Sequence, residues 1–278
     1  MDSWKQNTPV LMYHEVLDVV ERTKRIRSMM PLYCLSVEQF RRQMIHLRGH
    51  GFVTVTVEGL IGDQSSTGAP RVGITFDDGL IGNYRFAFPA LQEFGFTATI
   101  FVVVGRIGCD DRYLEWHQIR EMSRAGILIG SHTMTHRPLE QASEDVLFHE
   151  LNESKKIIED QIGIPVQHLS APHGSISCRT VEVAGEVGYS TISTSVLGIN
   201  IRGENPALID RIPIVSTDDP QRFARIVEMD RRLIEKLART KRMKNGLKRV
   251  IGIERYRRLY RWLFRINPSQ SGLEDRRS

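Results

Sequence analysis

Cysteine is scarce in this sequence, and long apolar runs are absent. The 278 residues include only Cys34, Cys109 and Cys178, an odd number without CxxC spacing. This pattern favours neither a disulfide framework nor a thiolate zinc site, and we interpret the three as buried free thiols. No apolar run approaches the roughly 20 residues that span a bilayer, and the N-terminus lacks a basic segment followed by an apolar one. We therefore expect a cytoplasmic protein.

Low-complexity tracts and internal repeats are also absent. A hydrophobic content of 41% over this length is enough to bury a full core. Charge is unevenly distributed: residues 221–278 hold 18 Lys and Arg against 6 Asp and Glu, a net +12, whereas the preceding residues carry −7. We therefore divide the chain into a main domain at residues 1–218 and a basic helical tail at residues 219–278.

Short apolar runs alternate with helical patterns in the main domain. Between the runs, residues 36–51 open with Ser36 as a predicted N-cap and Gln39 three residues on, and residues 143–163 repeat this plan. Strands that alternate with helices predict a parallel sheet, and this many units favour a (β/α) barrel over an open sheet. The predicted strands are VLMYH, FVTVTV, RVGITF, TATIFVVV, ILIGS, QHLSA, TISTSV and RIPIV.

The strand RVGITF ends in two adjacent aspartates, Asp77 and Asp78. Like charges this close repel each other, and burying either without a partner is costly, so a cation is expected nearby. Gly79 allows a sharp turn just past them, so that both carboxylates can lean over the end of the sheet.

The motif SHTMTH follows another predicted strand and carries His132 and His136. Four residues apart on a helical turn, two imidazoles share one face and can reach one ion. With one carboxylate they supply three ligands and leave positions open, as in a catalytic metal site. The alternative is a pair of surface histidines beside N-capping aspartates, with no metal.

Two further candidates also follow predicted strands. In LSAPHG, Pro172 ends the strand and Gly174 permits a close backbone approach, so the amide N–H groups of His173 and Gly174 are candidate oxyanion donors; an ordinary turn is the alternative. His14 ends VLMYH and is suited to protonate an amine leaving group, with a core or rim histidine as the alternative. In barrels of this kind, the functional loops gather at the C-terminal ends of the strands.

The segments TFDDG, SHTMTH and SAPHG resemble the first three motifs of the polysaccharide deacetylase family, also called the NodB-homology domain or carbohydrate esterase family four. The resemblance runs from about Pro9 to about Val215 and leaves out the basic tail. It implies a distorted (β/α)7 barrel whose catalytic domain removes N-acetyl groups from sugars with a divalent metal, for which we expect Zn²⁺.

The resemblance also implies roles for single residues. Asp77 matches the general base, and the backbone at His173 would help to hold the oxyanion. We expect Pro172 and Gly174 to border the substrate. The implied metal ligands are Asp78, His132 and His136.

Two positions depart from the family pattern. Many members have an arginine where this chain has Ser170, and a late histidine that RIPIVSTDD lacks. However, PVLMYHEV resembles the opening of a permuted branch, typified by poly-N-acetylglucosamine deacetylases, in which the N-terminal strand supplies the acid histidine; His14 matches it. Arg211 is our candidate for the missing arginine, since a guanidinium that reaches Asp77 would keep it ionised. Trp116, in a segment similar to the same branch, is a candidate wall of the sugar pocket, with a packed core indole as the alternative.

Together these residues predict metal-assisted hydrolysis of N-acetyl groups on a polysaccharide, an oligosaccharide or a lipid-linked glycan precursor. The alternatives are a deformylase or other amide hydrolase on the same fold and a glycan-binding module without activity. The tail predicts two amphipathic basic helices that either pack on the barrel or contact anionic lipid at the inner face of the membrane. Nucleic-acid binding has no other support in the sequence. The two apolar stripes are Ile226, Val227, Leu233, Ile234 and Leu237, and Leu247, Val250, Ile251, Leu259, Tyr260, Leu263 and Phe264.

Overall fold

The computed structural model describes residues 7–25, 31–62, 68–174, 176–198, 200–201 and 207–251. The strands are β1 (Asn7–Thr8), β2 (Val10–Tyr13), β3 (Glu15–Leu17), β4 (Cys34–Ser36), β5 (Val53–Val55), β6 (Arg71–Phe76), β7 (Thr99–Val102), β8 (Leu128–Ser131), β9 (His168–Ser170), β10 (Thr191–Ser193), β11 (Asn200–Ile201), β12 (Leu208–Ile209) and β13 (Ile212–Pro213). The α-helices are α1 (Val19–Arg25), α2 (Val37–Gly49), α3 (Val57–Gly62), α4 (Phe88–Phe94), α5 (Trp116–Arg124), α6 (Glu144–Ile162), α7 (Cys178–Val187), α8 (Pro220–Val227) and α9 (Arg231–Ile251). Short 3₁₀ or π turns are η2 (Pro31–Tyr33), η3 (Asn83–Ala87), η4 (Val104–Arg106) and η5 (Pro172–Gly174).

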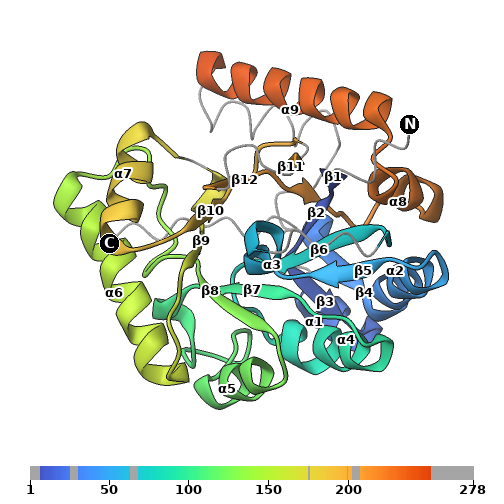
Figure 1. Cartoon of the computed structure of the whole chain (residues 1–278), viewed down its shortest axis with the longest axis horizontal. Helices are drawn as coiled ribbons and strands as arrows, with labels where there is room; N and C mark the ends of the chain where they lie inside the picture. The colour runs from blue at the N-terminus through green and yellow to red at the C-terminus, as the bar shows by residue number, and fades with distance from the viewer. Residues whose placement is uncertain are drawn as a thin grey trace.

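The main sheet is parallel and curls into a barrel. Its strand order is β12-β10-β9-β8-β7-β6-β2-β13, and β5 pairs with the start of β6. β12 and β13 are two parts of one segment: β12 pairs with β10 and β13 with β2, so this segment joins the two edges of the sheet. Counted as one strand, they give seven barrel strands with helices around the outside (Figure 1). The predicted distorted (β/α)7 barrel is confirmed, and each predicted strand run contains a strand.

Two helices begin and end where the sequence predicts. At the start of α2, the Ser36 hydroxyl accepts a hydrogen bond from the Gln39 N–H at 3.1 Å, and the Gln39 side chain accepts one from the Ser36 N–H at 3.0 Å. This reciprocal pair satisfies two donors that the helix itself leaves unpaired. α6 follows Ser143 and ends at Gly163, whose φ of 75° is left-handed and therefore favours glycine.

Side chains alternate between the inside and the outside of the barrel wall. Val10, Val57, Phe101 and Ile209 form a buried cluster separate from the main core, whereas strand neighbours such as Leu11 belong to the main core under the helices. Each buried side chain of this size stabilises the fold by about 1.5–3 kcal/mol. The predicted site residues follow at the C-terminal ends of the strands.

The first predicted tail helix is interrupted. α8 ends at Val227, Met229 has a left-handed φ of 60°, and Asp230 caps α9 by accepting a hydrogen bond from the Leu233 N–H at 3.1 Å. The apolar side chains of both helices join the main core: Phe223, Ile226, Val227, Leu233 and Ile234. The boundary at residue 218 therefore falls between segments that share a core, and the domain division stays a prediction. The second predicted stripe, from Leu247 to Phe264, lies outside the described side chains.

The thiols differ in exposure. Cys34 is buried in β4, but Cys109 lies in the loop after β7 and Cys178 opens α7, and both are exposed. The interpretation of three buried thiols is therefore wrong for two of them, because neither a loop tip nor an outward-facing first helical position belongs to the core.

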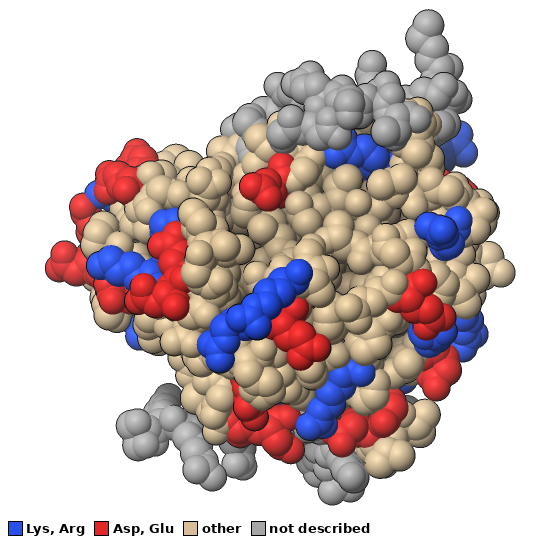
Figure 2. Space-filling view, turned by 60° about the horizontal axis from the view of Figure 1, so that its bottom comes forward, with Lys and Arg blue, Asp and Glu red and all other residues tan. Residues whose placement is uncertain are grey.

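Helix length and surface charge show how the described part of the chain could relate to a membrane. Every helix in the described part of the chain is too short or too polar to cross a bilayer. On the face shown in Figure 2, acidic and basic side chains are interspersed, and much of the described surface is uncharged.

Candidate active site

Asp77 lies inside the barrel and pairs with Arg211. The guanidinium donates to both carboxylate oxygens, at 2.7 and 2.8 Å, and both side chains are buried. Arg211 also donates to the Thr194 carbonyl at 2.9 Å and to the Ser170 hydroxyl at 2.8 Å. Burial raises the pKa of Asp77, but the charges of Arg211 and then His132 outweigh it and hold the pKa below its usual value. Asp77 is therefore ionised at neutral pH.

Asp78 points the other way, because the backbone turns at this residue. Asp78 has a φ of 75° and Gly79 one of 67°, so two consecutive residues are left-handed. This conformation is strained for an aspartate and is maintained only where the surroundings fix it. It separates the two carboxylates: Asp77 faces Arg211, and Asp78 faces His132 and His136.

His132, His136 and Asp78 converge on one point. Their ligand atoms lie within 4.8 Å of one another, and Asp78 Oδ1 is 3.1 Å from His136 Nε2 and 3.7 Å from His132 Nε2. Nitrogen and oxygen ligands ~2.1 Å from one tetrahedral ion lie roughly 3.4 Å apart, so this spacing suits a metal.

The protonation state of His132 leaves its Nε2 able to bind a cation. Its Nδ1 lies 2.8 Å from the Ser170 carbonyl oxygen, which can only accept, so Nδ1 carries the hydrogen. Burial lowers the pKa of His132 to about 4, so the ring is neutral and its Nε2 is a bare lone pair. This nitrogen faces Asp78 Oδ1, a buried oxygen that receives no well-aligned hydrogen bond from the described residues, although His136 Nε2 lies 3.1 Å away. Two electron-rich atoms at 3.7 Å need a cation between them, and a divalent ion meets that need.

The two imidazoles meet for a different reason from the one predicted. Residues 132–136 form a loop rather than a helical turn, and Thr133 and His136 are both left-handed, with φ of 69° and 65°. The helical explanation of the HxxxH spacing is therefore wrong. The loop itself folds the rings together, with centroids 4.9 Å apart.

Glu150 holds this loop and was missed in the sequence. Its buried carboxylate, on α6, accepts hydrogen bonds from the N–H groups of Met134 and Thr135 at 3.0 and 2.8 Å and from the Thr135 hydroxyl at 2.5 Å. A signal was available, because Glu150 lies on the apolar face of the predicted helix, next to Leu151. An acidic residue at such a position needs a partner from elsewhere in the fold.

His14 lies at the end of β2, near both aspartates. It is close enough to interact electrostatically with both carboxylates. The ring lies 4.7 Å from that of Tyr33 at a tilt of 39°, and its buried Nδ1 has no hydrogen-bond partner among the described residues. The structure thus brings His14 to the same site as the two motifs.

The third motif is only partly as predicted. The Gly174 N–H donates to the Ala171 carbonyl at 2.9 Å, so it is used inside the turn and the prediction that it is an oxyanion donor is wrong. Gly174 does allow a close approach, since a Cβ there would lie 2.4 Å from that of Ser195. Pro172 is buried, whereas His173 is exposed with a left-handed φ of 60° and places its ring 4.9 Å from that of His136.

Comparisons with known proteins show what the sequence and the fold resemble. The family model described as "Polysaccharide deacetylase" matches residues 64–192. YxkH of Bacillus subtilis (strain 168), whose name places it among the polysaccharide deacetylases, is 28% identical over 209 residues, 74% of this chain and 71% of that protein. The poly-beta-1,6-N-acetyl-D-glucosamine N-deacetylase of Staphylococcus aureus (strain MSSA476) is 24% identical over 172 residues, 56% of this chain and 59% of that protein.

A solved structure extends the similarity. The Streptococcus pyogenes deacetylase PplD, in complex with acetate, aligns with a TM-score of 0.71 and 25% identity over 80% of this chain and 98% of that one. By these matches the chain carries a polysaccharide deacetylase domain, at residues 64–192. The family match contains Asp77, Asp78 and both histidines of the second motif, but neither His14 nor Arg211. In this chain, the first and last barrel strands bring those two residues to the matched region.

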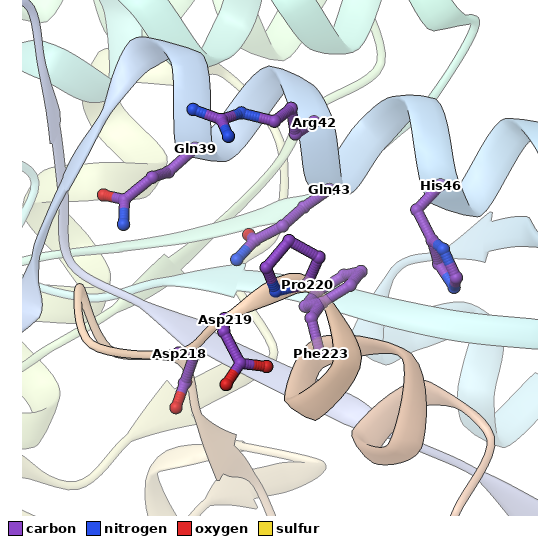
Figure 3. Close-up of a pocket in the computed structure, with 8 residues that line it drawn as sticks. All are labelled: Gln39, Arg42, Gln43, His46, Asp218, Asp219, Pro220 and Phe223. Atoms are coloured by element: carbon purple, nitrogen blue, oxygen red, sulfur yellow. The ribbon is translucent and has the colours of Figure 1, made fainter.

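Two other features complete the surroundings of the site. Trp116 is half-buried at the start of α5 and packs against the main core, as the predicted alternative describes. A separate polar cavity of about 180 Å³ lies between α2 and α8 (Figure 3). Its lining consists of Gln39, Arg42, Gln43, His46, Asp218, Asp219, Pro220 and Phe223. No residue of the predicted site lines this cavity.

Proposed function

We propose that the protein is a metal-dependent polysaccharide deacetylase that hydrolyses N-acetyl groups on a polysaccharide, an oligosaccharide or a lipid-linked glycan precursor. The observation that carries the proposal is the convergence of two imidazoles on the buried Oδ1 of Asp78, beside an ionised Asp77. The acetate in the streptococcal structure and the substrate named for the staphylococcal relative support acetyl chemistry on a glycan.

Each residue has a chemical task in this proposal. Asp78, His132 and His136 would hold a divalent ion, expected to be Zn²⁺, which polarises the acetyl carbonyl and makes a water more acidic. Asp77 takes the proton of the attacking water. Arg211 keeps Asp77 ionised but also makes its carboxylate a weaker base. The greater acidity of a metal-bound water would compensate for this.

Two further groups act on the amide. The N–H of His173 is the candidate donor to the oxygen on which negative charge develops. His14 gives a proton to the nitrogen as the C–N bond breaks, so that acetate and a sugar amine leave. The pairing of Arg211 with Asp77 supports its use in place of the arginine that many relatives carry at the position of Ser170.

The test measures acetate release and metal content together. The wild type, loaded with Zn²⁺, should release acetate from an N-acetylglucosamine oligomer and should stop when the metal is removed by a chelator. Asp77→Asn should bind the same amount of zinc and lose at least about 10²-fold in kcat, the usual scale for a general base. A normal rate in Asp77→Asn would refute the role of Asp77, and release of formate alone from an acylated panel would support the deformylase alternative. A wild type that binds zinc and releases no acetate contradicts the proposal.

We also propose that the basic tail contacts anionic lipid, at the inner face of the membrane. Arg231 and Arg239 of α9 both pair with Glu235, yet their side chains are 85% and 75% exposed, and Met243 beyond them is also exposed. Exposed cations beside apolar side chains favour an interface with anionic headgroups.

A further inference from the structure

Arg106 lies beside the candidate metal ligands, on a loop that both ligand motifs hold. η4, which ends at Arg106, follows β7. The Gly105 N–H donates to the Met134 carbonyl at 2.8 Å, and the Leu114 N–H, at the far end of the loop, donates to the Gly79 carbonyl at 2.9 Å. The position of Arg106 is therefore fixed relative to both motifs.

The guanidinium of Arg106 reaches the site itself. Its Nη1 is 3.9 Å from Oδ1 of Asp78, the same oxygen on which both imidazoles converge, and its side chain is 34% exposed. The ring of Tyr113 lies under it, with the guanidinium carbon 5.6 Å from the ring centroid. This cation–π contact holds the group in place, and its partial exposure leaves N–H donors available to a ligand.

Arg106 differs from the neighbouring arginines in having no carboxylate of its own. Arg211 has Asp77, and Arg112, which stacks on the same tyrosine, has Asp110 at 2.6 Å. The structure gives the guanidinium of Arg106 no hydrogen bond to any described residue, and its only acidic neighbour within 4 Å is Asp78. Asp78 is already shared by two histidines.

We propose that Arg106 binds an anionic group of the substrate, a carboxylate or a phosphate on the sugar that carries the acetamido group or on the next one. The inference rests on the proposed deacetylase function and narrows its substrate class to acidic glycans. A guanidinium edge matches the geometry of both oxyanions with two parallel hydrogen bonds. Its closeness to Asp78 places the bound group within a few ångströms of the scissile amide.

The kinetic test compares three N-acetylated oligosaccharides of equal length: a neutral one, one with a uronate and one with a sugar phosphate next to the acetamido sugar. The wild type should favour at least one charged substrate in kcat/KM by about tenfold to hundredfold, the scale of charge-assisted hydrogen bonds. Arg106→Gln should lose this preference, and Arg112→Gln should keep it. Which charged substrate is preferred distinguishes carboxylate from phosphate.

A binding test separates this inference from the function on which it rests. An acidic disaccharide without an acetamido group should bind the zinc-loaded wild type more tightly than its neutral counterpart, by titration calorimetry, and Arg106→Gln should bind the two equally. Absence of acetate release together with this binding preference would refute the proposed function alone. Equal binding of both disaccharides by the wild type, or equal losses of Arg106→Gln on charged and neutral substrates, would overturn the role of Arg106.

Discussion

Arg211 donates from Nη1 to Oδ1 of Asp77 at 2.7 Å and from Nη2 to Oδ2 at 2.8 Å, and both side chains are buried. Replacing the arginine by methionine would leave a buried carboxylate without a counter-ion. We expect Arg211→Met to lower the free energy of unfolding by about 3–5 kcal/mol in urea titrations. Arg112→Met, which breaks a largely exposed ion pair with Asp110, should cost less than about 1 kcal/mol. Equal effects of the two substitutions would show that Arg211 does not stabilise the fold through Asp77.

Removal of one imidazole should remove the metal. We expect His136→Ala to lower the zinc affinity at least about tenfold and to abolish acetate release, since two protein ligands would remain. His117→Ala is the matched control, because His117 lies on α5 with an exposed side chain outside the site. Plasma emission analysis after dialysis measures the zinc. Full zinc occupancy in His136→Ala would contradict the assignment of His136 as a ligand.

Glu150→Gln should weaken metal binding without touching a ligand. The amide keeps one acceptor oxygen but loses the charge that holds the Met134 and Thr135 N–H groups, so the strained loop becomes looser. We expect the zinc affinity, measured by competition with a chromophoric chelator, to fall about 10–100-fold. Glu153→Gln changes a more exposed residue of the same helix and should have no effect. If both variants bind zinc equally, Glu150 supports the fold alone.

The stability of the metal-free protein should fall in mild acid because of His168. Burial, and then the charge of Lys155, lower the pKa of His168 to about 4. The unfolded chain, with an ordinary pKa of about 6.5, therefore binds more protons than the folded one between these values, and stability decreases as pH falls from about 6.5 to 4. This residue accounts for a loss of about 3 kcal/mol, which His168→Asn should remove. An unchanged slope of unfolding free energy against pH in the variant would contradict this.

Liposome flotation tests the tail. Vesicles that contain anionic lipid should carry the full chain, whereas a chain that ends at Arg239 should float markedly less, because it loses most of the basic residues that follow α8. Neutral vesicles should carry neither. Equal flotation of the two chains would exclude a membrane role for the segment beyond Arg239.

Much of the fold follows from local signals in the sequence. The Ser36 and Gln39 pair and the glycine at position 163 mark helix ends because their hydrogen bonds and backbone conformation involve only near neighbours. The barrel strands follow from apolar runs because strands that are buried on both faces need apolar side chains on both. The break between α8 and α9 was not predicted, because the apolar spacing continues through it and only the left-handed Met229 interrupts the helix.

The site residues illustrate the limit of such signals. The motifs identify Asp78, His132 and His136, but the loop that joins the imidazoles depends on Glu150, which lies on another element. The Gly174 N–H donates within its own turn, and the sequence could not predict this because glycine can adopt many backbone conformations. The partner of Asp77 comes from 134 residues further along the chain, and the sequence offered it only as a candidate.

The segment from Leu208 to Pro213 both joins the edges of the sheet and carries Arg211. One segment thus closes the barrel and supplies the counter-ion of the candidate base. A chain cut before this segment would lose both the closure of the barrel and the partner of Asp77 at once. Local unfolding of this segment should therefore abolish activity while the other barrel strands remain paired.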